Sequence, residues 1–173
     1  MTTQEFIKKY KWVAIWNHIR YGIPASITLA QGIIESNSGN STLATKANNF
    51  FGIKAYSNPE NLPVFYATDD KVGEPFRMYD SAGDSFKDHS IFLLSNKRYT
   101  DTLNAGNYVE FSIELKKAGY ATSPTYASTI VSTIEKYNLS KYDNIGNNKW
   151  LYVSLLILFI LALVIGHKYL KTK

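Results

Sequence analysis

Residues 30–40, AQGIIESNSGN, close an apolar run with a single glutamate, Glu35, which is followed by small and amide residues and a glycine. The apolar residues before it recur at the spacing of one helix face. They are Ile23, Ile27, Ala30 and Ile34. Glu35 lies eight residues after Ile27, so it lies beside this buried face and not opposite it. The stretch therefore predicts a helix that ends at a half-buried acid.

Two interpretations of Glu35 follow from these residues alone. Desolvation raises the pKa of a carboxyl group, and a carboxyl that is protonated near neutral pH can donate its proton to a glycosidic oxygen as a general acid. The other interpretation is an ordinary glutamate near a helix end, although its charge there meets the negative pole of the helix dipole. Spacing alone favours the ordinary glutamate.

The segments around this stretch predict further helices and one hairpin. Thr2 and Glu5 have the spacing of a capping box, so the first helix should begin there and end at the turn of residues 22–24. Two short apolar runs within residues 63–79 flank a polar stretch, which is typical of a β-hairpin. Three more helices are expected at residues 81–95, 107–118 and 124–137, with Ser81 and Ser123 as caps. Trp12 and Trp16, four residues apart, are expected to lie in the core.

Composition narrows the class of protein without deciding its function. The chain has 173 residues, 45% of them hydrophobic and 14% aromatic, which is typical of one folded domain and not of a disordered chain. The net charge is +5, but the basic residues are scattered, so charge alone leaves both cell wall and nucleic acid open as partners. Cysteine is absent and the three histidines are far apart, so neither a thiol nucleophile nor a histidine metal site is predicted.

The C-terminal part of the sequence differs in kind from the rest. Residues 150–166 carry no charge and are bordered by aromatic residues, which predicts a membrane span over residues 150–169. We expect a domain over residues 1–140, a polar linker over 141–149 and a short basic tail over 170–173. The N-terminal residues predict a helix start and not a secretory signal. Lys136, Lys141 and Lys149 precede the uncharged residues 150–166, and Lys168, Lys171 and Lys173 follow them, so charge leaves the orientation of the span open.

Three blocks of the sequence resemble one family in the order that the family has them. Residues 30–55, AQGIIESNSGNSTLATKANNFFGIKA, resemble the signature A-Q-x-x-x-E-S followed by N-x-F-G-I/V-K of the glucosaminidase family of peptidoglycan hydrolases, glycoside hydrolase family 73. Residues 76–99, FRMYDSAGDSFKDHSIFLLSNKRY, are similar to its F-R-x-Y block. Residues 119–130, GYATSPTYASTI, resemble its G-Y-A-T-D-P-x-Y-A ending, with Ser123 in place of the usual aspartate.

The resemblance implies a mainly α (α+β) fold, a lysozyme-like helical domain with a small β-hairpin lobe, to which the predicted transmembrane helix is added. It implies that Glu35 is the catalytic acid and that Tyr120 lies near it. A second carboxylate is usual in the hairpin, where Asp70 or Asp69 is favoured over Glu74. The implied sugar-binding residues are Asn49, Phe51 and Tyr126.

The resemblance also implies a substrate and a reaction. The expected reaction is endo-type hydrolysis of the β-1,4 glycan of peptidoglycan on the reducing side of N-acetylglucosamine, with no cofactor, no metal and no nucleic-acid partner. The alternatives are an N-acetylmuramidase of the same fold and an inactive wall-binding membrane protein. Lipid bilayer is the second expected partner, through residues 150–169. Two hypotheses describe where the enzyme acts: it is a phage lysis or virion enzyme, or it is an enzyme of the bacterial inner membrane. The oligomeric state stays open.

Overall fold

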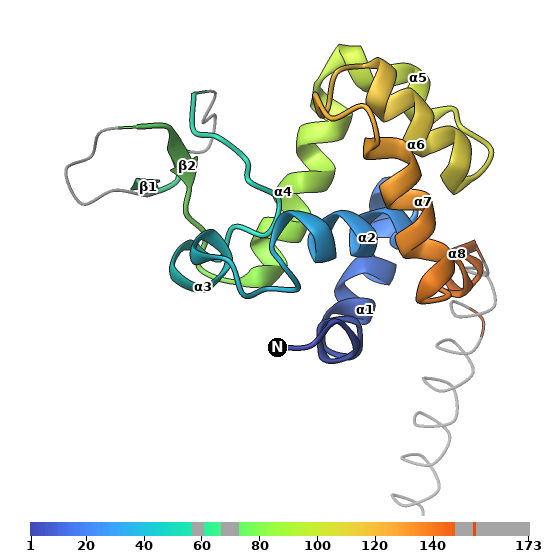
Figure 1. Ribbon diagram of the computed structural model, residues 1–173, viewed down its shortest axis with the longest axis horizontal. Helices are drawn as coiled ribbons and strands as arrows, with labels where there is room; N and C mark the ends of the chain where they lie inside the picture. Colours follow the sequence, from blue (N-terminus) through green and yellow to red (C-terminus); the bar gives the residue numbers. More distant parts are fainter. Residues whose placement is uncertain (57–60, 67–72, 148–153, 155–173) are drawn as a thin grey trace, which may run out of the picture.

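The computed structural model describes residues 1–56, 61–66, 73–147 and 154. The predicted span and tail lie outside these ranges, apart from residue 154. In the part of the chain that is described, no helix is both long and apolar enough to cross a membrane. Figure 1 shows a group of helices around α2, with a small β lobe extending to one side.

The central element is α2 (Ala25–Glu35), which packs against α1 (Thr3–Tyr21) and against three later helices. Every residue of α2 from Ala25 to Ile33 is buried, because helices cover it on several sides. Gly32 allows α1 to come close: a Cβ atom there would lie 3.0 Å from Cζ of Phe6. The predicted helix ending at Glu35 is therefore confirmed, and it forms the core of the domain.

The predicted start of α1 is also confirmed. The Thr2 hydroxyl accepts from the Glu5 backbone N–H, and the Glu5 carboxylate accepts from the Thr2 N–H at 2.7 Å. The helix ends at Gly22, whose φ of +77° suits a residue without a side chain.

The expectation that Trp12 and Trp16 lie in the core is wrong. Their side chains are 61% and 63% exposed. The buried face of α1 is formed by other residues, and positions 12 and 16 fall on the opposite face of the same helix. The core side of α1 is lined by Phe6, Ile7, Tyr10, Ala14 and Ile15.

Three more large helices complete the helical part of the domain. They are α4 (Ala82–Ser95), α6 (Tyr108–Lys117) and α7 (Tyr126–Lys136), with a 3-10 turn η1 (Lys97–Tyr99) and the short α5 (Thr100–Leu103) between α4 and α6. Ser81 caps α4 as predicted, since its hydroxyl accepts from the Asp84 N–H. Ser123 does not cap α7: the helix begins later, after Thr125, because residues 123–126 form a turn closed by the Tyr126 N–H on the Ser123 carbonyl.

The β lobe confirms the predicted hairpin. Strands β1 (Val64–Tyr66) and β2 (Pro75–Arg77) pair antiparallel, with Phe65 opposite Phe76. Lys54 forms an isolated bridge to Phe76, so the lobe also includes the segment that follows the short helix α3 (Thr42–Ala47).

The prediction of a polar linker over residues 141–149 is corrected, because residues 141–147 form the helix α8 (Lys141–Asn147). Asp143 accepts from both the backbone N–H and the hydroxyl of Ser26, at 2.8 and 2.6 Å. Pro24, which precedes α2, provides no side-chain cap, so Asp143 satisfies a free donor at the start of that helix. Tyr142 and Ile145 pack against the core. A long-range contact thus stabilises a segment of low intrinsic helix propensity.

Asp143→Ala is expected to lower the free energy of unfolding by about 1 to 2 kcal/mol, the usual effect of losing a helix cap. Chemical denaturation of the full chain, followed by circular dichroism, measures the change. Asn144→Ala, at an exposed position of the same helix, is the matched control and should stay within about 0.5 kcal/mol of the wild type. Equal losses in the two variants would contradict the capping role.

Candidate functional site

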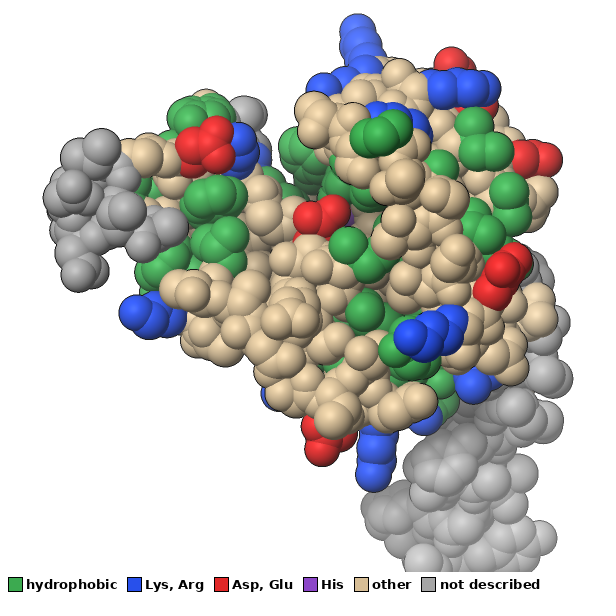
Figure 2. Space-filling view, viewed as in Figure 1, with side chains coloured by type: hydrophobic (Ala, Val, Ile, Leu, Met, Phe, Trp, Pro, Cys, Tyr) green, Lys and Arg blue, Asp and Glu red, His purple; other side chains and the backbone are tan. Residues whose placement is uncertain are grey.

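A groove of about 1230 Å³ runs between the β lobe and the wall formed by α4, η1 and α7. Figure 2 shows it as a hollow that is open to solvent. Its volume exceeds that of pockets that enclose one small molecule. The groove therefore has room for several units of a polymer. Its lining includes Ile34, Glu35, Phe51, Lys54, Arg77, Asp88, Phe92, Arg98, Tyr120, Thr122 and Tyr126.

Glu35 is the last residue of α2 and lies in this groove. The chain leaves the helix abruptly, since Asn37, Ser38 and Gly39 all have positive φ values of 50°, 54° and 78°. Two residues with side chains in this left-handed region are uncommon, and such strain clusters at functional sites. The Ser36 hydroxyl holds the turn by accepting from the Gly39 N–H at 2.7 Å. The turn ends the helix so that Glu35 stands at the groove surface.

The carboxyl group of Glu35 is protonated more readily than an ordinary glutamate. The residue is exposed, contrary to the half-burial expected from the sequence, but the walls of the groove remove part of the hydration of its carboxyl group. This partial desolvation raises the pKa of Glu35. A carboxyl of this kind can serve as a proton donor.

Two tyrosines lie close to Glu35. The ring centroids of Tyr120 and Tyr126 are 5.6 Å apart, and both side chains line the groove. Burial is the largest cause and raises the pKa of both phenols. At Tyr126 the hydrogen bond from Gln31 opposes this shift, and the negative charge of Glu35 adds to it at both residues, so each stays a neutral O–H group. Gln31 Nε2 donates to the Tyr126 hydroxyl at 2.8 Å, which leaves the hydrogen of that hydroxyl available to another acceptor.

Tyr126→Phe is expected to lower kcat/KM on the substrate of the groove by about tenfold, because it removes one hydrogen bond and keeps the ring. Steady-state kinetics measure the change. Gln31→Met removes the group that orients the hydroxyl but not the hydroxyl itself, so its effect should be smaller. A Tyr126→Phe enzyme with wild-type kinetics would exclude the hydroxyl from the reaction.

Asp88 is the other carboxylate that lines the groove among the described residues. Arg77 Nη1 donates to both of its oxygens, at 2.9 and 2.8 Å, and the Tyr79 hydroxyl donates at 2.6 Å. Arg77 is 5% and Asp88 7% exposed, so the ion pair is buried. This pair joins β2 to α4, one wall of the groove to the other. Both oxygens of Asp88 are therefore taken up by structural contacts, and Glu35 is the other carboxyl group that lines the groove among the described residues.

The structure corrects the predicted sugar contact of Asn49. The residue is 1% exposed, and its amide donates to the carbonyls of Ile53 and Arg77 and accepts from the Ile53 N–H. All of these bonds are internal, and they fasten the chain before the lobe to β2. Asn49 shapes the groove without lining it.

Phe51 does line the groove, with 5% of its surface exposed. Its ring stacks on His89, with the centroids 4.0 Å apart and the planes 15° apart. His89 is fully buried, and burial lowers its pKa to about 3, so the imidazole is neutral at physiological pH. Neither ring nitrogen of His89 has a hydrogen-bond partner among the described residues. The histidine supports the groove floor as a packed aromatic ring.

Asp69 and Asp70 lie outside the described residues, so their predicted role stays a prediction. Glu74 is described: its carboxylate is exposed and pairs with Lys54. Glu74 is absent from the groove lining, whereas its partner Lys54 is part of it. Within the described ranges, no group of three or more His, Asp or Glu side chains is placed to hold a metal ion.

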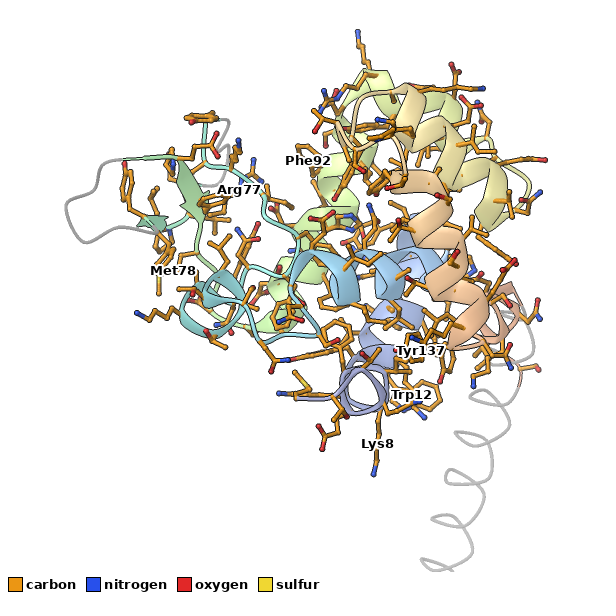
Figure 3. All side chains as sticks on the ribbon, viewed as in Figure 1. Lys8, Trp12, Arg77, Met78, Phe92 and Tyr137 are labelled. Atoms are coloured by element: carbon orange, nitrogen blue, oxygen red, sulfur yellow. The ribbon has the colours of Figure 1, made fainter. Side chains whose placement is uncertain are left out.

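Sequence reasoning missed Gln31, Arg77 and Asp88 as parts of the site. Each had a signal: Gln31 lies one helical turn before Glu35, and the other two lie in the F-R-x-Y and D-H segments of one block. What the sequence does not show is that Arg77 pairs with Asp88 and Gln31 with Tyr126. These partners are 11 and 95 positions apart, so the hydrogen bonds between them depend on the tertiary fold. Figure 3 shows Arg77 and Phe92 on facing walls of the groove.

Known proteins resemble this chain in sequence. Exo-glucosaminidase LytG of Bacillus subtilis (strain 168) is 39% identical over 139 residues, 73% of this chain and 49% of that protein. Peptidoglycan hydrolase FlgJ of Pseudomonas aeruginosa is 34% identical over 123 residues, 64% of this chain and 31% of that protein. The chain thus spans about half, or less, of the length of these curated relatives.

Solved structures share the fold. The glycoside hydrolase domain from Salmonella typhimurium FlgJ superposes with a TM-score of 0.69 at 27% identity, covering 89% of this chain and 99% of that one. The catalytic domain of the autolysin Auto from Listeria monocytogenes gives a TM-score of 0.68 at 30% identity, covering 82% and 87%. The model of the glucosaminidase family, described as mannosyl-glycoprotein endo-beta-N-acetylglucosaminidase, matches residues 12–139. With its helical fold, its small sheet and the acid at the end of α2, the chain belongs to the glucosaminidase family.

Proposed function

We propose that the protein hydrolyses the β-1,4 glycan of peptidoglycan, with Glu35 as the general acid. The observation that carries the proposal is a carboxyl group with a raised pKa in a groove whose volume has room for several sugar units. Membership of the glucosaminidase family and the names of the peptidoglycan hydrolases among the relatives support the substrate.

In the proposed reaction, Glu35 protonates the glycosidic oxygen as the bond to the leaving sugar breaks. The hydroxyl groups of Tyr120 and Tyr126, which stay neutral, donate hydrogen bonds to the substrate or to developing negative charge. The anomeric carbon of the other sugar, where positive charge develops, is attacked either by water that a carboxylate deprotonates, or by the acetamido oxygen of the substrate, which water then displaces. The sequence between the two strands contains the candidate carboxylates for the first route, Asp69 and Asp70.

The bond that we propose is the one on the reducing side of N-acetylglucosamine, cut within the strand. A second candidate is the muramidase reaction, because a probable N-acetylmuramidase of Lactococcus lactis is 32% identical over 138 residues. The two reactions leave different sugars at the new reducing end.

The test uses the full chain, purified in detergent, on isolated peptidoglycan. Fragments are reduced with borohydride and identified by mass spectrometry, with the Glu35→Gln variant as the matched control. Reduced N-acetylglucosamine ends support the proposal, and reduced N-acetylmuramic acid ends favour the muramidase. Absence of new reducing ends with the wild-type chain would overturn both and leave a wall-binding protein.

We also propose that residues 150–169 anchor the protein in a membrane, with the catalytic domain on the wall side. The absence of charge over residues 150–166 and the aromatic residues at their edges support this. Both settings, a bacterial inner membrane and the membrane of a phage virion, meet the same test. Protease added to intact spheroplasts or particles should degrade residues 1–147, and full protection in both would exclude outward display.

A further inference from the structure

The most exposed aromatic residues of α1 form one line along the helix. Trp12 and Trp16 are 61% and 63% exposed and lie one turn apart. Lys8 and Arg20 continue the line by four residues in each direction, and both are exposed. We refer to Lys8, Trp12, Trp16 and Arg20 as the α1 stripe. Two adjacent exposed tryptophans on a helix indicate a surface that meets a partner.

The charge around the α1 stripe is basic. Lys9 and Lys11 lie on the same helix, and its acidic residue, Glu5, is occupied in the capping box with Thr2. Tryptophan rings prefer the headgroup level of a bilayer, while lysine and arginine bind the phosphates of anionic lipids. The pattern is typical of a helix that lies on a membrane surface.

The course of the chain points to the same occupant. Helix α8 packs against α1 and ends at Asn147. Three positions further on, the sequence enters the uncharged residues 150–166. The helix that carries the α1 stripe is therefore the one that packs against α8, the last described helix before the most apolar segment of the sequence.

We propose that the α1 stripe is a docking surface for an anionic lipid bilayer, on which the catalytic domain rests. The inference depends on the proposed anchoring by residues 150–169, which would hold α1 near the membrane and so favour a weak contact.

Docking through the α1 stripe would set the direction of the groove. In Figure 3, Lys8 and Trp12 lie at one end of the domain, and Arg77 and Phe92, which line the groove, lie toward the other. A bilayer against α1 would thus leave the groove open on the side away from the lipid. The docked domain would present its groove to glycan at a limited height above the membrane.

Quenching of tryptophan fluorescence by lipid tests this proposal. The full chain with Trp150→Phe, in which Trp12 and Trp16 are the remaining tryptophans, is reconstituted in vesicles of phosphatidylglycerol and phosphatidylcholine with brominated acyl chains. We expect most of the emission to be quenched. Lys8→Gln and Arg20→Gln should each lower the docking equilibrium about fivefold on these vesicles.

The control moves the reporter to another face. In a chain with Trp12, Trp16 and Trp150 all replaced by Phe, Ile113→Trp places one tryptophan on α6, at a position that is 41% exposed. Its emission should not be quenched by brominated lipid. Emission from Trp12 and Trp16 that is equally unquenched, in protein that floats with the vesicles, would overturn docking and leave the anchor standing.

Two further outcomes also overturn the proposal. Protein that fails to float with anionic vesicles has neither an anchor nor a docking surface. Tryptophans protected from iodide in water yet unquenched by brominated lipid would assign the α1 stripe to a protein contact, such as a second copy of the chain. Hydrolysis of peptidoglycan is measured on the same samples, so a failure of the proposed activity is distinguished from a failure of docking.

Discussion

Replacing Glu35 with glutamine is expected to lower kcat for peptidoglycan hydrolysis by about 100-fold to 10,000-fold, the usual contribution of a general acid. Glutamine has nearly the same shape and still fits the groove, but it has no proton to give to the leaving oxygen. The change should appear in kcat and hardly in KM, because the proton is transferred only in the transition state. Release of reducing ends from soluble glycan strands measures both constants. A Glu35→Gln enzyme with more than a tenth of the wild-type kcat would remove Glu35 from the mechanism.

The pH dependence of the wild-type enzyme offers a second measure of the same group. Glu35 must be protonated to act, and desolvation raises its pKa above the ordinary value. Activity should therefore fall as the pH rises through that raised pKa. The residual activity of Glu35→Gln should not show this fall with rising pH. If the fall is present in the wild type and absent from the variant, the titrating group is Glu35.

Replacing Glu35 with glutamine should lower activity without lowering stability. A carboxyl whose pKa is raised by folding contributes stability that is present at low pH and is lost as the pH rises through the folded-state pKa. At neutral pH the variant Glu35→Gln should therefore be at least as stable as the wild type, and the difference should shrink near pH 4. Thermal unfolding at the two pH values checks this. A marked loss of stability at neutral pH would mean that the fall in activity reflects unfolding.

Asp88→Ala is expected to lower the free energy of unfolding by about 3 to 5 kcal/mol. The reason is the guanidinium of Arg77, which is 5% exposed and would lose the carboxylate that accepts from Nη1 at 2.8 and 2.9 Å. Domains of this size have a total stability of about 5 to 15 kcal/mol, so the loss is a large share. Urea denaturation of the full chain measures it.

Two comparisons decide whether charge burial is the cause. The double variant Arg77→Leu with Asp88→Leu removes both charges, so it should recover much of the lost stability. Glu74→Gln breaks the exposed pair with Lys54 and should cost less than about 1 kcal/mol. If the double variant is no better than Asp88→Ala, or if Glu74→Gln is as severe, burial of the pair does not explain the effect.

Features that depend on neighbouring residues were predictable from the sequence. The capping box of Thr2 and Glu5, the cap of Ser81 and the end of α2 at Glu35 all follow from residues a few positions apart. The hairpin was predictable for the same reason, since its paired strands, residues 64–66 and 75–77, are close together in the sequence. The family resemblance added the role of Glu35, which spacing alone did not favour.

Features that depend on distant residues were not predictable in this way. Helix α8 relies on a hydrogen bond between Asp143 and Ser26, 117 positions apart, and its asparagine and glycine residues suggested a linker. The spacing of Trp12 and Trp16 shows that they share a face but not that the face is open to solvent. Asn49 matches the family motif, yet the partners of its amide show a structural role.

The bond between Asp143 and Ser26 also decides where the domain can be cut. A fragment bounded by the family match, residues 12–139, would lack the first turns of α1 and all of α8. It would lose Phe6 from the core and the cap at the start of the helix that ends in Glu35. Loss of activity in such a fragment would reflect a poorly supported helix and say nothing of the chemistry. The shortest fragment that keeps the first turns of α1 and the whole of α8 runs from Met1 to Asn147.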